Sequence, residues 1–291
     1  MSIIVDKRSR VLVQGITGNE GSFHTRQMLR YGTNVVAGVT PGKGGQVVEG
    51  VPVYDHVADA AAREGANVSI VFVPARSARA AMMESLDAGI RTIVAITESI
   101  PLRDTMELIA HARTKSAVIV GPNTAGVLDP SSRTLVGIMP THIFSPGPVG
   151  IASRSGTLTY EVAWHITSGG PGQSTCVGIG GDPMRGLDFV DVLEMFRRDD
   201  DTEAVVLIGE IGGNAEESAA RYVVETAYPK PVVAYVAGRM APPEKRMGHA
   251  GAIIMGGAGS ADGKIEAFRK AGVGVAEKPS DVPALLRAAP R

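Results

Sequence analysis

His249 is the residue of this chain best suited to covalent chemistry, because small residues surround it in Arg246-Met247-Gly248-His249-Ala250-Gly251-Ala252. A neutral imidazole is a nucleophile when a carboxylate orients its other ring nitrogen. Glu210, at the end of an apolar run and before Ile211-Gly212-Gly213, could provide that carboxylate. The alternative for His249 is a structural or surface histidine, and the alternative for Glu210 is a solvated acid in a loop. The open setting distinguishes His249 from the other histidines, which are His24, His56, His111, His142 and His165.

A third segment, Ser153-Arg154-Ser155-Gly156-Thr157, follows an apolar run and precedes a helix-like stretch. Its hydroxyls and free amides could hold a phosphoryl group, although simple N-capping by serine is the alternative. All three segments are expected at strand ends, where ligands gather in open α/β sheets, so we expect one site. The sequence has no His/Cys/Asp cluster with metal-ligand spacing and no G-x-S-x-G or Walker lysine pattern, which disfavours metal sites and serine hydrolases.

A glycine-rich loop near the amino terminus, Gly15-Ile16-Thr17-Gly18-Asn19-Glu20-Gly21, follows an apolar run and opens a helix that should end near Tyr31-Gly32. Amides at such a helix start favour phosphate, but a tight strand–helix turn is equally consistent with the glycines. After the next apolar run, an NAD enzyme would carry an acidic residue. Here the segment reads Thr40-Pro41-Gly42-Lys43-Gly44-Gly45. Lys43 suits an additional phosphate and disfavours NAD, although most lysines are only solvated loop charges.

Short Val/Ile runs alternate with amphipathic stretches, a pattern typical of parallel βαβ units. The first half is Rossmann-like, with strands expected at 11–13, 34–39, 68–73, 92–96 and 117–120 and helices that include 77–88 and 101–113. A second α/β series has strands at 149–152, 175–179, 204–208 and 232–236 and helices near 157–167, 188–196 and 215–226. Residues 122–148, rich in Gly, Pro, Ser and Thr, interrupt the rhythm. We therefore predict a domain over 1–123, a linker over 124–147 and a second domain over 148–291.

The composition predicts a cytoplasmic protein whose ligands are small soluble molecules. With 291 residues and a formal net charge of -1, the chain has neither a basic stripe for nucleic acid nor a polybasic membrane patch. Its single cysteine, Cys176, excludes an internal disulfide framework, as expected in a reducing cytosol. The apolar runs are too short to span a membrane.

Taken together, these segments resemble the α subunit of succinyl-CoA synthetase, also called succinate–CoA ligase, over essentially the whole chain. The resemblance rests on motifs in a fixed order: Gln14-Gly15-Ile16-Thr17-Gly18, Val39-Thr40-Pro41-Gly42-Lys43-Gly44-Gly45, Ser153-Arg154-Ser155-Gly156-Thr157-Leu158-Thr159-Tyr160-Glu161, Gly178-Ile179-Gly180-Gly181-Asp182-Pro183, Ile208-Gly209-Glu210-Ile211-Gly212-Gly213 and Lys245-Arg246-Met247-Gly248-His249-Ala250-Gly251-Ala252-Ile253-Ile254.

The resemblance implies a Rossmann-like CoA-binding domain followed by a flavodoxin-like ligase domain. It also implies a partner β subunit with an ATP-grasp fold, which binds most of the ATP or GTP and its Mg2+. The implied reaction is a reversible, ADP- or GDP-forming ligation of CoA to a dicarboxylic acid in the tricarboxylic acid cycle, through acyl-phosphate and phosphohistidine intermediates.

The resemblance also assigns roles to single residues. It implies that His249 carries the phosphoryl group, that Glu210 orients it and that Tyr160 lies at the acid substrate. The implied CoA-binding residues are Thr17, Gly18, Asn19, Glu20, Lys43, Ile96, Thr97 and Glu98. The residues implied to hold the phosphohistidine are Ser153, Ser155, Gly156 and Thr157.

Four positions depart from the usual pattern of that family. Thr124 and Ala125 replace a Cys-Pro pair, Ser99 replaces a glycine and Arg76 replaces a proline. They leave the acid open, because malate–CoA ligase and other dicarboxylate ligases share these motifs. Two alternatives belong to other classes. A non-catalytic CoA-binding regulatory protein is disfavoured by the intact Glu210 and His249, and an NAD oxidoreductase is disfavoured by Lys43.

Overall fold

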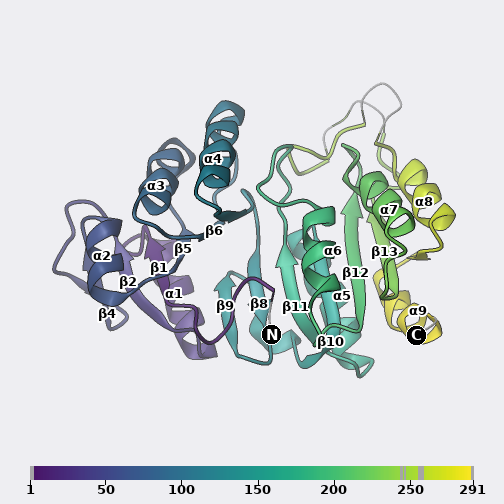
Figure 1. Ribbon diagram of the computed structural model, residues 1–291, viewed down its shortest axis with the longest axis horizontal. Helices are drawn as coiled ribbons and strands as arrows, with labels where there is room; N and C mark the ends of the chain where they lie inside the picture. The colour runs from purple at the N-terminus through teal and green to yellow at the C-terminus, as the bar shows by residue number, and fades with distance from the viewer. Residues whose placement is uncertain (1–2, 243–244, 246, 255–258, 290–291) are drawn as a thin grey trace.

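The computed structural model describes residues 3–242, 245, 247–254 and 259–289. Two seven-stranded sheets, each with helices packed on it, lie side by side along the longest axis of the molecule (Figure 1). The alternating strand and helix segments expected from the sequence form these two sheets and their helices. The first part of the chain forms one sheet and the later part forms the other.

The first sheet has the strand order β3-β4-β2-β1-β5-β6-β7. Apart from β3, which pairs antiparallel with β4, its strands are parallel, and their order is that of a Rossmann fold. The order reverses between β1 and β5, which is where such sheets bind ligands. The strand bounds are β1 Val11–Gln14, β2 Val35–Val39, β3 Val47–Val48, β4 Val51–Tyr54, β5 Val68–Val71, β6 Thr92–Ala95 and β7 Val118–Val120.

The helices of the first domain begin directly after the carboxyl ends of strands or after short loops. Helix α1 starts behind the glycine loop and ends at Gly32, whose backbone N–H donates to the carbonyls of Met28 and Leu29. A φ of 124° at Gly32 is a conformation that favours glycine, so the chain stops the helix where the sequence predicts. The helix bounds are α1 Asn19–Tyr31, α2 Val57–Glu64, α3 Ala75–Asp87 and α4 Leu102–Thr114.

The second sheet has the order β14-β13-β12-β10-β11-β8-β9. Its parallel part, β11-β10-β12-β13-β14, has the flavodoxin-like order, which reverses between β10 and β12. Strands β12 and β13 carry the longest apolar runs of this part, as expected of parallel strands that helices cover on both faces. The strand bounds are β8 Gly126–Asp129, β9 Thr134–Gly137, β10 Pro146–Ser153, β11 Gln173–Gly178, β12 Ala204–Glu210, β13 Val232–Ala237 and β14 Gly274–Ala276.

The helices of the second domain start at polar capping residues. The Ser155 hydroxyl accepts from the Leu158 N–H at the start of α5, and Asp188 and Asp191 form a capping box at the start of α6. The helix bounds are α5 Gly156–Ser168, α6 Phe189–Arg197, α7 Ala215–Glu225, α8 Ala261–Lys270 and α9 Val282–Ala288, with 3-10 helices at Thr141–Ile143 and Pro279–Asp281. In the part of the chain that the structure describes, no helix has the length and apolar character needed to cross a membrane.

The predicted linker over 124–147 is replaced by ordered structure. Strands β8 and β9 form an antiparallel hairpin there, and β8 pairs with β11, so the hairpin belongs to the second sheet. The polar, proline-containing residues of this stretch form the hairpin turn, where the Asp129 carboxylate accepts from the N–H groups of Ser131 and Ser132. The composition therefore reflects a turn and close backbone approaches instead of a loose connection.

The hairpin also fastens the two domains together. Helix α1 packs against β9, and β8 and β9 form the edge of the second sheet that lies next to the first domain in Figure 1. The Thr33 hydroxyl donates to the carbonyl of Leu135 at 2.9 Å, and the Leu135 N–H donates back to that hydroxyl at 2.9 Å. One cluster of buried apolar side chains continues from β1 and α1 into the second sheet. The hairpin thus sets the position of one domain on the other.

Candidate active site

His249 and Glu210 are in direct contact, as the sequence predicts. Nδ1 of His249 lies 2.9 Å from Oε2 and 3.0 Å from Oε1 of Glu210. A carboxylate only accepts hydrogen bonds, so this contact places the proton of the neutral imidazole on Nδ1 and leaves Nε2 with its lone pair. The hydrogen bond that His249 donates to Glu210 raises the pKa of the histidine, while burial opposes that rise. The histidine side chain is 30% exposed and that of Glu210 9%, so the imidazole is the more accessible group of the pair.

Three neighbouring strands end at this site. Glu210 is the last residue of β12, Ser153 is the last residue of β10, and the segment after β11 carries Gly181. The backbone of Gly181 packs against the His249 ring, because a β-carbon there would lie 2.4 Å from Cγ of His249. The Gly251 N–H donates to the Gly181 carbonyl, which ties the histidine loop to the same segment. His249 therefore lies at the point where the strand order of the second sheet reverses.

The helix start predicted to hold a phosphoryl group follows β10, whose last residue, Ser153, pairs with Ile208 of β12, two residues before Glu210. Ser155 is the N-cap of α5, and Gly156 and Thr157 are its first two residues. The Ser153 hydroxyl donates to the Ser155 carbonyl at 2.9 Å, so both serines also have a structural role. The unpaired amides at the start of α5 favour an anion. Of the wider motif around the histidine, Arg246 lies outside the described residues.

Tyr160 lies on the next turn of α5 and is half-buried. Its hydroxyl oxygen would lie 3.9 Å from a β-carbon at Gly156, so it faces the start of the helix. Burial raises the pKa of Tyr160 to about 12, which keeps the phenol protonated and able to donate a hydrogen bond. Its contact with an acid substrate stays a prediction.

Four of the predicted CoA-binding residues line one cavity of about 360 Å³ in the first domain, at the carboxyl ends of β5 and β6. They are Glu20, Ile96, Thr97 and Glu98. The Thr97 hydroxyl donates to the carbonyl of Val73 at 2.7 Å and joins the two loops that form the wall. Ile138, just after β9, closes the cavity from the second domain.

Two aromatic residues in this cavity were not predicted from the sequence. His24 stacks on Phe72 with ring centroids 5.4 Å apart and an interplanar angle of 3°. Burial lowers the pKa of His24, although the neighbouring Glu20 opposes that change. The sequence signal that could have identified His24 is its position one helical turn after Glu20, on the same face of α1.

The remaining predicted CoA-binding residues lie outside the lining of this cavity. Gly18 is the N-cap of α1, Asn19 is its first residue, and the Thr17 hydroxyl donates to the hydroxyl of Thr40 at 3.1 Å. Lys43 is exposed on the loop after β2. That loop is held by Asp55, whose Oδ1 accepts from the Gly44 N–H at 2.9 Å. The two predicted phosphate-binding loops are thus neighbours at the carboxyl edge of the first sheet.

Asn123 connects the two sites. Its backbone N–H donates to the carbonyl of Thr97 in the first domain, and its carbonyl accepts from the N–H of Gly181. Its side-chain amide donates to Oδ1 of Asp182 at 3.0 Å. Burial raises the pKa of Asp182, the charge of Glu98 adds to the rise and His249 opposes it. The sequence motif that contains Gly181 and Asp182 carried no role in the sequence analysis, and its role is to join the two sites.

The four departures from the usual pattern occupy different settings. Ser99 has a φ of 60°, a left-handed conformation that glycine adopts without strain. Thr124 is buried, and its hydroxyl donates to the carbonyl of Gly178 while accepting from the Gly126 N–H at 2.9 Å. Ala125 is buried, whereas Arg76 is exposed on α3.

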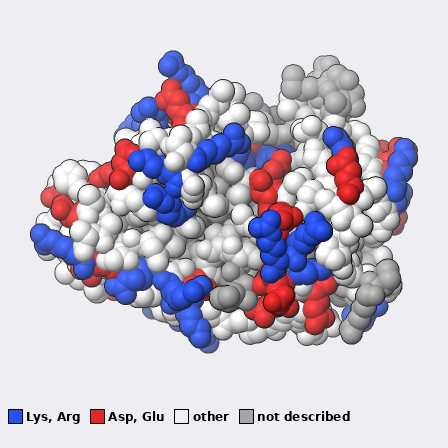
Figure 2. All heavy atoms as spheres, in the orientation of Figure 1, with Lys and Arg blue, Asp and Glu red and all other residues white. Residues whose placement is uncertain are grey.

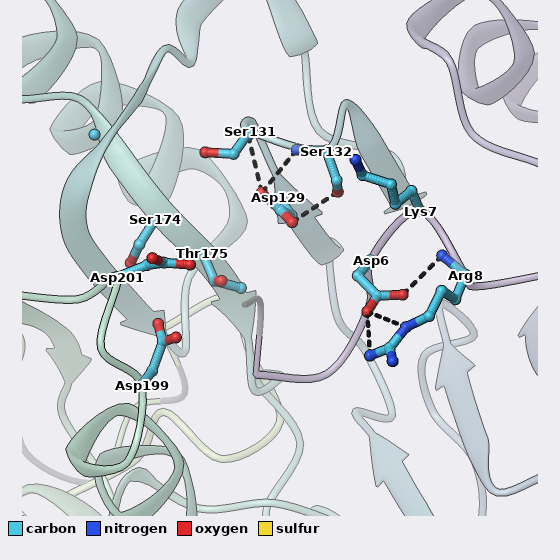
Figure 3. Close-up of a pocket in the computed structure, with 11 residues that line it drawn as sticks. Asp6, Lys7, Arg8, Asp129, Ser131, Ser132, Ser174, Thr175, Asp199 and Asp201 are labelled. Atoms are coloured by element: carbon cyan, nitrogen blue, oxygen red, sulfur yellow. Dashed lines mark hydrogen bonds and ion pairs between the residues drawn. The ribbon is translucent and has the colours of Figure 1, made fainter.

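A second cavity, of about 450 Å³, lies at the opposite end of the second sheet (Figure 3). Its lining comes from the amino-terminal ends of β10 and β11, the hairpin turn and the first described residues, whereas His249 lies where strands end. The polar groups there serve local structure: the Ser132 hydroxyl donates to Oδ2 of Asp129 at 2.7 Å. On the face shown in Figure 2, acidic and basic side chains are interspersed over both domains.

Comparison with known proteins agrees with a CoA-binding domain followed by a ligase domain. Residues 6–99 match the family model of a CoA binding domain, and residues 152–274 match the family model of a CoA-ligase. The fold, the site and these matches define the class: an acid–CoA ligase subunit with one domain of each kind.

Two relatives give the particular family. The chain is 56% identical to succinate–CoA ligase [ADP-forming] subunit alpha 2 of Archaeoglobus fulgidus, over 98% of this chain and 99% of that protein. It is 57% identical to the corresponding alpha subunit of Aquifex aeolicus, over 97% and 92%. The chain belongs to the family of succinate–CoA ligase α subunits. Among solved structures, ATP citrate lyase from Methanothrix soehngenii in complex with citrate and coenzyme A is similar, with a TM-score of 0.87 and 27% identity over 97% of this chain and 50% of that one.

Proposed function

We propose that this chain is the CoA-binding, phosphoryl-carrying α subunit of an ADP-forming succinate–CoA ligase. The observation that carries the proposal is the contact of 2.9 Å between Nδ1 of His249 and Glu210, which leaves Nε2 as a nucleophile. The names of the relatives, all printed as ADP-forming, support the nucleotide, and the same names support succinate as the acid.

The proposed cycle uses His249 as a carrier. In the direction that releases CoA, phosphate displaces CoA from the acyl group and yields an acyl phosphate. Nε2 of His249 then attacks the phosphorus atom, the P–O bond to the acyl group breaks, and the free acid leaves as a carboxylate. The phosphoryl group passes from Nε2 to ADP, and the reverse sequence joins the acid to CoA. A covalent carrier divides the exchange into steps that need not share one set of contacts.

Glu210 and the start of α5 would have separate tasks in this cycle. Glu210 holds the Nδ1 proton and stabilises the positive charge that the ring acquires as Nε2 attacks. The amides of Gly156 and Thr157, at the positive end of the helix macrodipole, would hold the phosphoryl oxygens of the phosphohistidine. Tyr160 remains the proposed contact of the acid substrate.

CoA would occupy the first domain. We propose that its phosphates contact the loop from Thr17 to Glu20 and the Lys43 ammonium, and that the cavity lined by Ile96, Thr97 and Glu98 holds the arm that ends in the thiol. That arm is a chain of methylene and amide groups, and the lining offers it both apolar side chains, such as Phe72 and Ile138, and the polar Thr97. Asn123 places the end of this cavity next to the segment that supports His249, which would bring the thiol toward the reacting group.

A β subunit with an ATP-grasp fold would complete the enzyme and bind the nucleotide with Mg2+. The relatives are named as α subunits, which supports a partner. Co-expressed with its partner, the chain should form acyl-CoA from succinate, ATP and CoA, whereas the purified chain alone should give negligible turnover. ATP-dependent acyl-CoA synthesis by the partner-free chain would contradict the proposal.

Malate is the second candidate acid, because Thr124 and Ala125 stand where the family usually has Cys-Pro. The buried Thr124 hydroxyl donates to the carbonyl of Gly178, the last residue of β11, so this difference lies just before the segment that carries Gly181. Comparing kcat/KM for succinate and malate in the assembled enzyme distinguishes the two acids. A higher value for malate would replace succinate in the proposal and leave the phosphoryl chemistry intact.

A further inference from the structure

Arg154, which has no role in the cycle above, contacts Glu210 in two ways. It directly follows β10 and is only 3% exposed. Its Nη1 donates to the carbonyl of Glu210 at 3.2 Å and to that of Gly212 at 2.9 Å. Its Nη2 lies 3.4 Å from Oε1 of Glu210, the same carboxylate that contacts His249. One guanidinium group therefore meets both the backbone and the carboxylate of the residue that orients the nucleophile.

Two further buried charges hold the guanidinium in place. Oε1 of Glu216, on α7, accepts from Nη1 of Arg154 at 2.8 Å and from the backbone N–H of Glu210 at 3.1 Å. The other oxygen of Glu216 accepts from Nζ of Lys264 on α8, and that lysine also donates to the Gly213 carbonyl at 3.0 Å. Glu216 and Lys264 are fully buried. The carbonyl of Glu210 is thus held by Arg154 and its N–H by Glu216, and Glu216 is in turn held by Lys264 on α8.

A network of buried charges such as this one stabilises a fold poorly, because burying the charges costs free energy. Removing two charges from water costs several kcal/mol per ion, and apolar residues of similar volume often stabilise a core equally well. Burial opposes ionisation of Glu216, yet the charges of Arg154 and Lys264 lower its pKa. The contacts of the network converge on residues 210–213, so its clearest effect is to set the position of Glu210.

We propose that Arg154, anchored by Glu216 and Lys264, is a positioning residue that fixes the Glu210 carboxylate against Nδ1 of His249 for phosphoryl transfer. This inference rests on the proposed role of His249 as phosphoryl carrier.

The charge of Arg154 gives this role a measurable consequence. The charged groups that face His249 are Glu210 and Asp182, which raise its pKa, and Arg154, which lowers it; burial also lowers it. Loss of the guanidinium charge should therefore raise the pKa of His249 further. Less of the imidazole is then neutral at a given pH, so the rise of the phosphorylation rate with pH should move to higher pH.

The test measures phosphorylation of His249 by labelled ATP against pH in the complex with the partner subunit. Arg154→Met removes the charge and keeps the length, and Glu216 retains Lys264 as its counterion. We expect a rate roughly ten- to hundred-fold lower, as for outer partners of catalytic groups, with the pH profile moved upward and CoA affinity unchanged. Arg154→Lys should recover part of the rate, and Lys264→Met should move the profile in the same direction by less.

Lys270→Met is the matched control, because Lys270 lies on the same helix in an exposed pair with Glu266 at 2.7 Å. It should keep the parental rate and pH profile. If Arg154→Met does not fold, Arg154→Lys and Lys264→Met decide the question. Parental rates in these variants, with an unmoved profile in Lys264→Met, overturn the positioning role alone. A parent complex that carries no label on His249 overturns the proposed function instead, so the two failures are distinguishable.

Discussion

Gly181 and His249 form a fitted contact in which the imidazole packs on bare backbone. A β-carbon at Gly181 would lie 2.4 Å from Cγ and 2.5 Å from Nδ1 of His249, closer than such atoms approach in proteins. The φ of Gly181 is not in the left-handed region, so this position needs glycine for space and not for backbone conformation. The backbone of the segment after β11 therefore packs against one side of the ring and keeps it oriented toward Glu210.

Gly181→Ala should displace the imidazole from Glu210 and slow phosphorylation of His249 by about a hundred-fold, within the range attributed to general acid–base groups. CoA affinity, measured by isothermal titration, should stay at the parental value because the CoA cavity lies in the other domain. Gly274→Ala is the control, since a β-carbon there meets its nearest neighbours at 3.8 Å. Parental labelling of Gly181→Ala would show that the contact does not position the ring.

Glu210→Gln should change the pH dependence of phosphorylation with a defined sign. Glu210 raises the pKa of His249, so loss of the carboxylate charge should lower that pKa and shift the rise of the rate toward lower pH. The maximal rate should fall by roughly two to four orders of magnitude, because the neutral amide of glutamine does not keep the proton of His249 on Nδ1 as the carboxylate does. The measurement is the labelling rate between about pH 5 and 8, the range over which imidazoles titrate. A profile that moves to higher pH would contradict this assignment.

Ser99→Gly should stabilise the protein, because Ser99 has a φ of 60° and a left-handed conformation costs a non-glycine residue about 1 kcal/mol. The midpoint of thermal unfolding should rise by about 2 °C for a chain of this size. Calorimetry of the parent and variant checks the result, and Ser168→Gly, at the end of α5, should not raise the midpoint. A lower midpoint for Ser99→Gly would show that contacts of the serine outweigh the backbone strain.

Lys43→Ala tests the expected phosphate contact in the first domain. The side chain is exposed, so its loss should weaken CoA binding by up to about five-fold, and the effect should shrink as salt is added. Lys278→Ala removes an exposed charge in the other domain and should have no effect on CoA affinity. Equal affinities of Lys43→Ala and the parent for CoA would remove Lys43 from the proposed site.

Much of this architecture is accessible from the sequence because periodicity and glycine position carry it. The predicted runs at 204–208 and 232–236 lie within β12 and β13, and the helix predicted to end near Tyr31-Gly32 ends there. Glu210 and His249 could be paired because small residues flank both and one of them follows a strand. The hairpin at β8 and β9 was missed because its turn composition is that of a linker.

The rest depends on tertiary contacts that no local pattern encodes. The ion pairs of Glu216 with Arg154 and Lys264 join residues 62 and 48 positions apart in the chain, and each charge alone is typical of a solvated surface. Ile138 lines the cavity proposed for CoA only because the hairpin places the second domain against the first. The backbone at Gly181 could be identified as the support of the ring only when the two loops were seen together.

Labelling of His249 tests the central claim most directly. Incubating the assembled enzyme with labelled ATP should place acid-labile, alkali-stable phosphate on this one residue. His249→Asn should abolish both the label and overall turnover while CoA binding persists, because CoA is assigned to the first domain. Label that persists in His249→Asn, or that maps to another histidine, would contradict the account.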